Sequence, residues 1–282
     1  MEFSKTKALG LAALLAFTSS VSAELVTNWD YSVNTKWTGA AFVDKGNIPA
    51  PYTENKVVTD TELSWGAAGG DYTNHDASGY NARSALIINP AMVDGNVNTQ
   101  LDVDVNGLSA TEWRTSSGIT HYNNSLQNFY DYLNIAYLSS ELVLTPLLPP
   151  EAVDGDVTLT TSFEVAFIET YNQPNAADCG FESVTACDDI FVLDGSLLNQ
   201  SFYYNDYIYT VHIGADGLRP LSNATCAVAG VSAGCVGFTT EEKTSTFAGF
   251  FFAVSAKKVP EPATLALFGL ALLGLRLSAR KN

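Results

Sequence analysis

The segment Asp156–Asn172, DVTLTTSFEVAFIETYN, indicates the fold class of this chain. Apolar or β-branched side chains occupy every second position along it, and polar residues stand mostly between them. The alternating positions are Val157, Leu159, Thr161, Phe163, Val165 and Phe167. A period of two residues places all of these side chains on one side of an extended strand. The segment therefore predicts a β-strand with one face in a core.

Six further segments are short apolar or alternating runs typical of strands. They span residues 84–89, 97–105, 133–144, 189–194, 201–214 and 246–256. Turn-forming pairs of Gly with Asp or Asn separate several of them, and neither an amphipathic helix nor an internal repeat is evident. Strands at this spacing predict an all-β protein, an antiparallel β-sandwich of about eight to ten strands.

Composition and charge narrow the class of protein. Of the 282 residues, 46% are hydrophobic and 16% are charged, which favours a folded core over disorder. The formal net charge is -16. Because proteins that bind nucleic acids are basic where they meet phosphate, this charge argues against a nucleic-acid partner.

The N-terminal residues 1–23 have the three parts of a secretory signal peptide. Two lysines precede an apolar run at Ala8–Phe17, and the small residues before Glu24 form a cleavage site. An uncleaved anchor is the alternative, but the apolar run is short for a bilayer span. The sequence predicts export, with residues 24–256 as the exported domain.

Export to an oxidising compartment makes disulfides the favoured interpretation of the cysteines. The chain has four of them, Cys179, Cys187, Cys226 and Cys235, which allow three connectivities. The local pairing, Cys179 with Cys187 and Cys226 with Cys235, closes two short loop-like intervals and is the one predicted here. A zinc site is the rival, but neither CxxC spacing nor nearby histidines support it.

No arrangement of residues predicts a catalytic or metal centre. The segment Asp102–Gly107, DVDVNG, begins like a calcium loop, but position twelve of that loop is Trp113 instead of a bidentate glutamate. No cofactor is therefore expected, and a calcium site remains as an alternative built from loop acids, namely Asp94, Asp154, Asp156, Asp188 and Asp189. The three histidines lack metal-binding spacing.

The stretch Thr120-His121-Tyr122-Asn123 is a compact polar group beside apolar residues. Threonine, histidine and asparagine side chains can all form hydrogen bonds with backbone groups at the end of a strand. A structural role for Thr120, His121 and Asn123, with His121 partly buried and bonded to the backbone, is therefore predicted. A functional motif is the alternative.

The C-terminal residues 257–282 differ from the rest of the chain. The prolines in Val259-Pro260-Glu261-Pro262 cannot continue a helix or a central strand. Thirteen apolar or small residues follow at Ala263–Leu275, and basic residues end the chain. This run predicts a short transmembrane helix whose basic end stays cytoplasmic.

The tripeptide Pro260-Glu261-Pro262, the apolar run and the basic end together closely resemble the PEP-CTERM sorting signal of proteins exported by Gram-negative bacteria. The resemblance implies recognition by an exosortase, a membrane transpeptidase, and association with the cell surface or with exopolysaccharide. With that signal present, Thr120, His121 and Asn123 resemble the motif of a THxN subfamily. Membership of this subfamily implies no catalytic residue.

The sequence thus predicts a non-enzymatic exported protein, anchored in the membrane before processing and then held at the cell surface or in the extracellular matrix. A carbohydrate-binding or adhesive module is one alternative, because aromatic rings can stack on sugars. The aromatic residues concerned are Trp29, Trp37, Trp65, Trp113 and the tyrosine-rich segment 202–209. A polysaccharide hydrolase with two unrecognised carboxylates is a further alternative.

Overall fold

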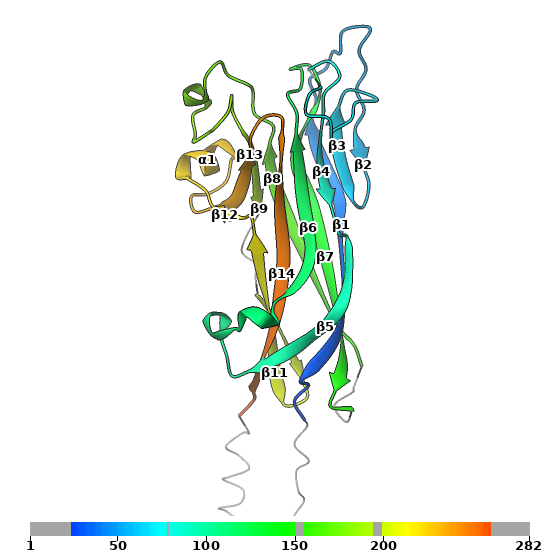
Figure 1. The fold of residues 1–282 in the computed structure, drawn as a ribbon, viewed down its shortest axis with the longest axis vertical. Helices are drawn as coiled ribbons and strands as arrows, with labels where there is room; N and C mark the ends of the chain where they lie inside the picture. The colour runs from blue at the N-terminus through cyan, green and yellow to red at the C-terminus, as the bar shows by residue number, and fades with distance from the viewer. Residues whose placement is uncertain (1–23, 78, 151–154, 194–198, 261–282) are drawn as a thin grey trace, which may run out of the picture.

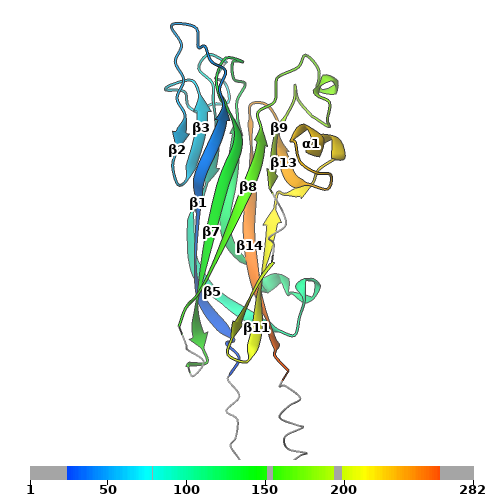
Figure 2. The same ribbon diagram turned by 180° about the vertical axis from the view of Figure 1, so that it is seen from behind.

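The structure is a computed structural model that describes residues 24–77, 79–150, 155–193 and 199–260. The molecule is elongated, and both Glu24 and the end of the last strand lie at one end, here called the terminal pole (Figure 1). The opposite end, here called the distal pole, carries the loop segments 44–56, 67–77, 79–82, 124–131 and 169–188 (Figures 1 and 2).

In the described part of the chain, fourteen strands form one sheet. Their bounds are β1 Asn28–Val43, β2 Val57–Val58, β3 Glu62–Gly66, β4 Arg83–Ile88, β5 Met92–Leu101, β6 Arg114–Asn123, β7 Tyr132–Leu148, β8 Val157–Ile168, β9 Asp189–Leu193, β10 Asn199–Tyr204, β11 Tyr207–Asp216, β12 Arg219–Pro220, β13 Val236–Thr240 and β14 Thr244–Lys258. The order across the sheet is β12-β13-β9-β8-β7-β1-β5-β14-β6-β4-β3-β2, and β11 pairs with β14 and with β10.

The all-β prediction is confirmed, but the expected pair of separate antiparallel sheets is replaced by one continuous mixed sheet. The pairing of β14 with β5 is parallel, whereas the other strand pairs are antiparallel. This pairing joins the two halves of the sheet. Side chains from β1, β7, β8, β9 and β13 pack in one core cluster with side chains from β3, β4, β6 and β14, so the sheet curves over its own interior.

Strand β8 follows the alternation of the sequence. Val165 and Phe167 are fully buried, and Phe163 packs against the same core. The strand ends at Ile168, earlier than the alternating pattern suggests, because the chain turns there into the loops of the distal pole.

Two corrections concern strands. Strand β1 was not predicted, although Trp29, Tyr31 and Val33 alternate along it and are all buried. The segment 201–214 is not one strand but the hairpin of β10 and β11, because Asn205 adopts a positive φ of 53° and reverses the chain. Asparagine tolerates this left-handed conformation better than most residues.

The structure also contains short helices that the sequence did not predict. Helix α1 spans Asn223–Val228. Its N-cap residue is Ser222, whose Oγ accepts a hydrogen bond from the backbone N–H of Thr225 at 3.1 Å. Single 3-10 turns occupy Val105–Gly107, Ala110–Glu112 and Ala176–Cys179. These elements are too short to give a clear helical period, which explains why periodicity did not reveal them.

The described interior has three apolar clusters: a small one beside helix α1, formed by Phe181, Ile190, Val192 and Ala229, and two larger ones that follow each other along the long axis. The cluster nearer the distal pole contains Trp37, Trp65 and Phe167, and the cluster nearer the terminal pole contains Trp29 and Tyr209. Trp29 makes edge-on contacts with three aromatic rings there, at centroid distances of 5.2–5.9 Å. Aromatic pairs in this geometry stabilise a core beyond the area they bury.

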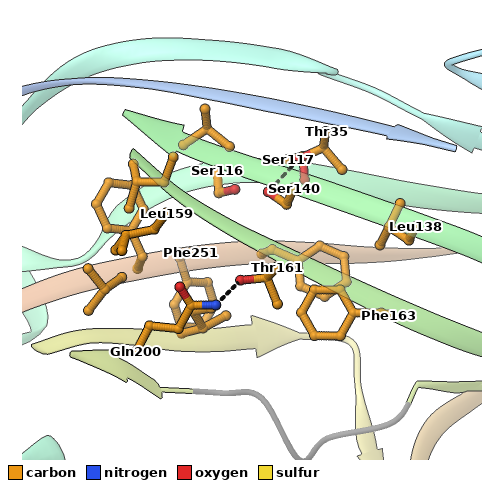
Figure 3. Close-up of a pocket in the computed structure, with 16 residues that line it drawn as sticks. Thr35, Ser116, Ser117, Leu138, Ser140, Leu159, Thr161, Phe163, Gln200 and Phe251 are labelled. Carbon is orange, nitrogen blue, oxygen red and sulfur yellow. Dashed lines mark hydrogen bonds between the residues drawn. The ribbon is translucent and has the colours of Figure 1, made fainter. Parts of the chain in front are cut away.

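A small cavity of about 60 Å³ lies where the two larger clusters meet (Figure 3). A bulge opposite Phe250 leaves both Ser116 and Ser117 among the lining residues. Two hydrogen-bonded pairs of side chains also line the cavity: Gln200 Nε2 donates to Thr161 Oγ1, and the hydroxyls of Thr35 and Ser140 are 3.0 Å apart. Small hydroxyl side chains at this level leave the core incompletely filled.

Filling this cavity should stabilise the protein. We expect Ser117→Val to raise the free energy of unfolding by up to about 1 kcal/mol, because the added methyl groups fill part of the cavity and so remove part of its destabilising effect. Leu142→Ala, which enlarges the same cavity, should lower it by about 2–5 kcal/mol. Equilibrium urea denaturation of both variants measures the changes. A clear loss of stability in Ser117→Val would show that the serine hydroxyl contributes more than the missing packing.

Candidate functional site

The predicted motif residues lie at the end of β6, as expected. Asn123 is the last residue of that strand, and His121 pairs with Leu86 of β4 on one side and with Thr246 of β14 on the other. Both His121 and Asn123 have no exposed surface, while Thr120 is partly buried. The motif therefore forms part of the wall of the distal core.

His121 is enclosed by aromatic rings. Its ring is nearly parallel to that of Trp65 at 6.3 Å and meets Phe167 edge-on at 4.9 Å. Neither ring nitrogen has a hydrogen-bond partner, so the expected bonds to the backbone are absent and that prediction is wrong. Burial lowers the pKa of His121 to about 3, which keeps the ring neutral at physiological pH.

Asn123 does brace the strand end. Its Nδ2 donates to the backbone oxygen of Thr240 at 3.0 Å and, more weakly, to Glu242 Oε1 at 3.4 Å. These bonds tie the end of β6 to the turn between β13 and β14. An apolar residue at this position would remove the donor to the buried Thr240 carbonyl, and a buried acceptor left without its partner costs about 1–3 kcal/mol, so the position favours asparagine.

Three carboxyl groups converge behind the motif, and Glu169, Asp189 and Glu242 are here called the acid cluster. Trp65 Nε1 donates to Glu169 Oε2 at 2.8 Å. The backbone N–H of Thr170 donates to Asp189 Oδ1 at 2.8 Å, and Asp189 Oδ2 lies 3.7 Å from His121 Nε2. Since that histidine is neutral, the contact with Asp189 is not an ion pair.

Burial shifts the pKa of every carboxyl group in the acid cluster upward. Burial raises the pKa of Glu169 to about 8, and the neighbouring Glu242 adds to the increase. Burial, followed by the charges of Glu169 and Glu242, raises the pKa of Asp189 well above its ordinary value. The pKa of Glu242 is raised by burial as well, against the opposing effect of a hydrogen bond from Ser125. Protonation thus avoids like charges in a dry interior.

Metal ligation finds no support in the residues that the structure describes, where no group of three His, Cys, Asp or Glu side chains could hold an ion. Asp104 of the calcium-like stretch instead accepts hydrogen bonds from the backbone N–H groups of Asn106 and Gly107, at 3.0 and 3.1 Å. Asp188 accepts a hydrogen bond from the backbone N–H of Thr185, three residues before it, at 2.9 Å, while Asp189 belongs to the acid cluster.

Both predicted disulfides are present. Cys179 bonds to Cys187 and Cys226 bonds to Cys235, with Cα atoms 5.3 and 5.8 Å apart. The first disulfide closes a loop that precedes Asp188 and Asp189, and the second ties helix α1 to the chain entering β13. Short loops of this kind restrict the unfolded chain and so stabilise the fold.

The aromatic residues proposed as sugar platforms are mostly internal. Trp29, Trp37 and Trp65 are at most 3% exposed and belong to the core. The sequence analysis missed instead three rings at the distal pole. Tyr52 stacks on Tyr80 at 4.3 Å and lies 6.0 Å from Phe129. The three rings come from three separate loops. Their proximity could have been suggested only by the pairing of the strands that precede and follow those loops.

The sorting segment begins where the sheet ends. Strand β14 extends to Lys258, and the backbone N–H of Val259 donates to the carbonyl of Asp206 at 2.8 Å. Val259 and Pro260 are described, whereas Glu261, Pro262, the apolar run and the predicted signal peptide at residues 1–23 lie outside the described residues. Within the part that the structure covers, every helix falls short of the length and apolar content that a membrane crossing requires.

Comparison with protein-family models finds a PEP-CTERM protein-sorting motif at residues 258–281. No curated protein matches the chain. The motif implies that the protein is exported, sorted to the membrane or cell surface, and processed by an exosortase. It covers the C-terminal segment and starts at the last residue of β14, immediately after the folded domain.

The environment of His121 predicts different results for two substitutions. His121→Phe keeps the ring contacts with Trp65 and Phe167 and removes two unpartnered nitrogens, so stability should stay the same or rise. His121→Ala should lower the free energy of unfolding by about 3–5 kcal/mol, as loss of a buried ring does. Thermal and urea unfolding check both variants. A Phe variant as unstable as the Ala variant would show that the nitrogens have a stabilising partner.

The acid cluster predicts that stability falls as the pH rises from about 5 to 8. Because the pKa of Glu169 is about 8 in the folded state and 4.5 when unperturbed, the folded protein binds more protons between these values, and raising the pH favours unfolding. Asp189 and Glu242 act in the same direction. His121 has the opposite effect below its ordinary pKa of 6.5. In that range the unfolded state binds a proton that the folded state does not bind, so His121 makes stability rise with pH.

Denaturation curves across this pH range measure the slope. Asp189→Asn keeps the acceptor for Thr170 but removes one titrating group, so its slope should be shallower by at most about 1.4 kcal/mol per pH unit. The matched control is Asp60→Asn, an exposed acid outside the cluster, which should leave the slope unchanged. Equal slopes in the wild type and Asp189→Asn would contradict a buried, protonated Asp189.

Proposed function

We propose that the β domain is a non-catalytic domain displayed at the cell surface or in an extracellular polysaccharide matrix. The observation that carries this proposal is the position of the sorting motif. The motif starts at Lys258, at the same pole as Glu24, so the chain enters and leaves the domain on one side. With the C-terminal segment in the membrane, the distal pole is directed away from the bilayer.

The motif residues support a domain without catalysis. We infer that Thr120, His121 and Asn123 belong to the THxN pattern and that this pattern is structural. His121 has no exposed surface, and its lowered pKa makes the imidazole a weak base near neutral pH. Asp189 is sealed in the same interior. Groups that substrate and water cannot reach favour a role in packing.

Carbohydrate binding is the second candidate, and one observation favours it. The rings of Tyr52, Tyr80 and Phe129 stack at the distal pole, where Tyr80 is 46% exposed. A polysaccharide hydrolase is supported less, because such enzymes use two carboxyl groups that flank the scissile bond. Of the acid cluster, Glu169 alone lines a distal cavity in the described residues.

Processing by the exosortase should remove the C-terminal segment. We expect cleavage close after Pro262, because the two prolines keep the backbone extended beside the membrane. Without the signal peptide the charge is -16 - 1 = -17, and loss of Arg276, Arg280 and Lys281 takes it to -17 - 3 = -20. A simple single-pass anchor is the alternative.

Intact-mass analysis of the full chain, produced in a Gram-negative host with and without its exosortase, tests this prediction. The expected product lacks the peptide after Pro262 only when the exosortase is present, and a Glu261→Ala variant stays uncleaved. The control Glu164→Ala, an exposed residue of β8, is processed normally. A surface species that still carries residues 277–282 would instead establish the permanent anchor.

A further inference from the structure

A polar cavity opens at the distal pole beside the acid cluster. Its volume is about 320 Å³, at the lower end of the range for small-ligand sites. It is lined by Lys45, Leu126, Gln127, Asn128, Tyr130, Tyr132, Glu169, Thr170, Tyr171 and Asn172. These residues come from the loop after β1, from the loop before β7 together with Tyr132 at the start of that strand, and from the chain following β8. The cavity is therefore formed by three loops that the sheet holds together.

The chemistry of the lining combines aromatic rings with hydrogen-bonding groups. The Lys45 ammonium lies 4.6 Å from the ring centres of both Tyr132 and Tyr171, and it hydrogen-bonds to the Tyr171 hydroxyl. Tyr171 is 53% exposed, so part of its ring remains available. The amides of Gln127, Asn128 and Asn172 add both donors and acceptors.

The electrostatics of the cavity differ from those of the protein as a whole. The chain has a net charge of -16, yet Lys45 is the single charged side chain among these described lining residues at neutral pH. Glu169 is the one acid there, and its raised pKa of about 8 keeps the carboxyl protonated. A neutral or anionic ligand therefore meets no repelling carboxylate at the wall.

The stacked rings of the distal pole continue from this cavity. Tyr130 lines the cavity, its hydroxyl donates to the backbone oxygen of Tyr80 at 2.8 Å, and its ring meets Phe129 at 4.7 Å. Phe129 and Tyr80 then adjoin Tyr52. Tyr130 is 2% exposed, so it joins the wall of the cavity from below to the partly exposed rings of Phe129 and Tyr80 at the outside of the pole.

We propose that this cavity binds one pyranose unit of an extracellular polysaccharide, and that adjoining units lie across Tyr80. The sugar ring stacks on Tyr171, and its hydroxyl groups bond to Lys45 and to the lining amides. Uncharged hexoses and uronic acids share this chemistry, and Lys45 gives the uronic acids an additional ion pair. The proposal rests on the display of the distal pole described above and names the ligand class of that pole.

Calorimetric titration of the full chain in lipid nanodiscs with cellohexaose, maltohexaose and an oligouronate hexamer tests the site. At least one of them should bind, and Tyr171→Ala should weaken binding by about tenfold, equivalent to about 1.4 kcal/mol. Lys45→Met should weaken binding of the oligouronate more than that of the uncharged sugars. Tyr203→Ala, a 75% exposed tyrosine of β10 near the terminal pole, should leave binding unchanged.

Two outcomes would overturn the site. One is the absence of binding to every probe, and the other is binding that Tyr171→Ala and Tyr203→Ala affect equally. Intact mass of the same variants separates this failure from failure of the proposed function. A wild-type chain that is exported and processed but binds none of the sugars refutes the cavity alone, whereas an unprocessed wild-type chain refutes the sorting on which display depends.

Discussion

The parallel pairing of β14 with β5 is the constraint on which the architecture depends. It consists of the pairs Val254 with Thr99, Ser255 with Gln100 and Ala256 with Leu101. Strand β1 leaves the terminal pole and β5 returns antiparallel to it, so β14, parallel to β5, also runs back to that pole. This one pairing closes the two halves of the sheet over a shared core and brings the sorting motif beside the beginning of the exported domain.

The two ends of the interior have different physical characters. Near the terminal pole the core is aromatic and apolar, built around Trp29 and Tyr209. Near the distal pole the core includes buried polar groups: the guanidinium of Arg83 is 4% exposed and bonds to Ser64, and the acid cluster lies behind His121. Buried polar atoms without partners cost free energy, so the packing of the distal half stabilises the fold less than the packing of the terminal half. Sites that bind ligands commonly occur where packing is compromised in this way.

The difference between the two poles agrees with the orientation of the domain that the C-terminal motif implies. The terminal pole carries the start of the PEP-CTERM motif, which implies processing by an exosortase, while the distal pole carries a loop closed by a disulfide and aromatic rings from three other loops. The long strands β1, β7 and β14 connect the poles without interruption, and a continuous hydrogen-bonded sheet separates the cavity from the anchoring end by the full length of the molecule (Figures 1 and 2).

Local pattern was sufficient for several properties of this protein. Alternation along β8 gave the strand and its inward face, the short intervals between cysteines gave both disulfides, and the Pro-Glu-Pro step with its apolar and basic neighbours gave the sorting motif. The same alternation marks β1 from Trp29 to Val33, so that strand was visible in the sequence although it was not proposed. The hairpin of β10 and β11 depended on one left-handed residue, Asn205, which a strand-length pattern does not reveal.

Tertiary structure alone decided which distant segments meet. The choice of β5 as the partner of β14, the convergence of Glu169, Asp189 and Glu242, and the cavity around Lys45 all join segments that are far apart along the chain. Strand propensity and periodicity describe one segment at a time, whereas register, burial and the resulting pKa shifts depend on which neighbours exclude water from a group. The raised pKa of Glu169 depends on burial among segments that are distant along the chain, and nothing in its neighbouring residues along the chain encodes it.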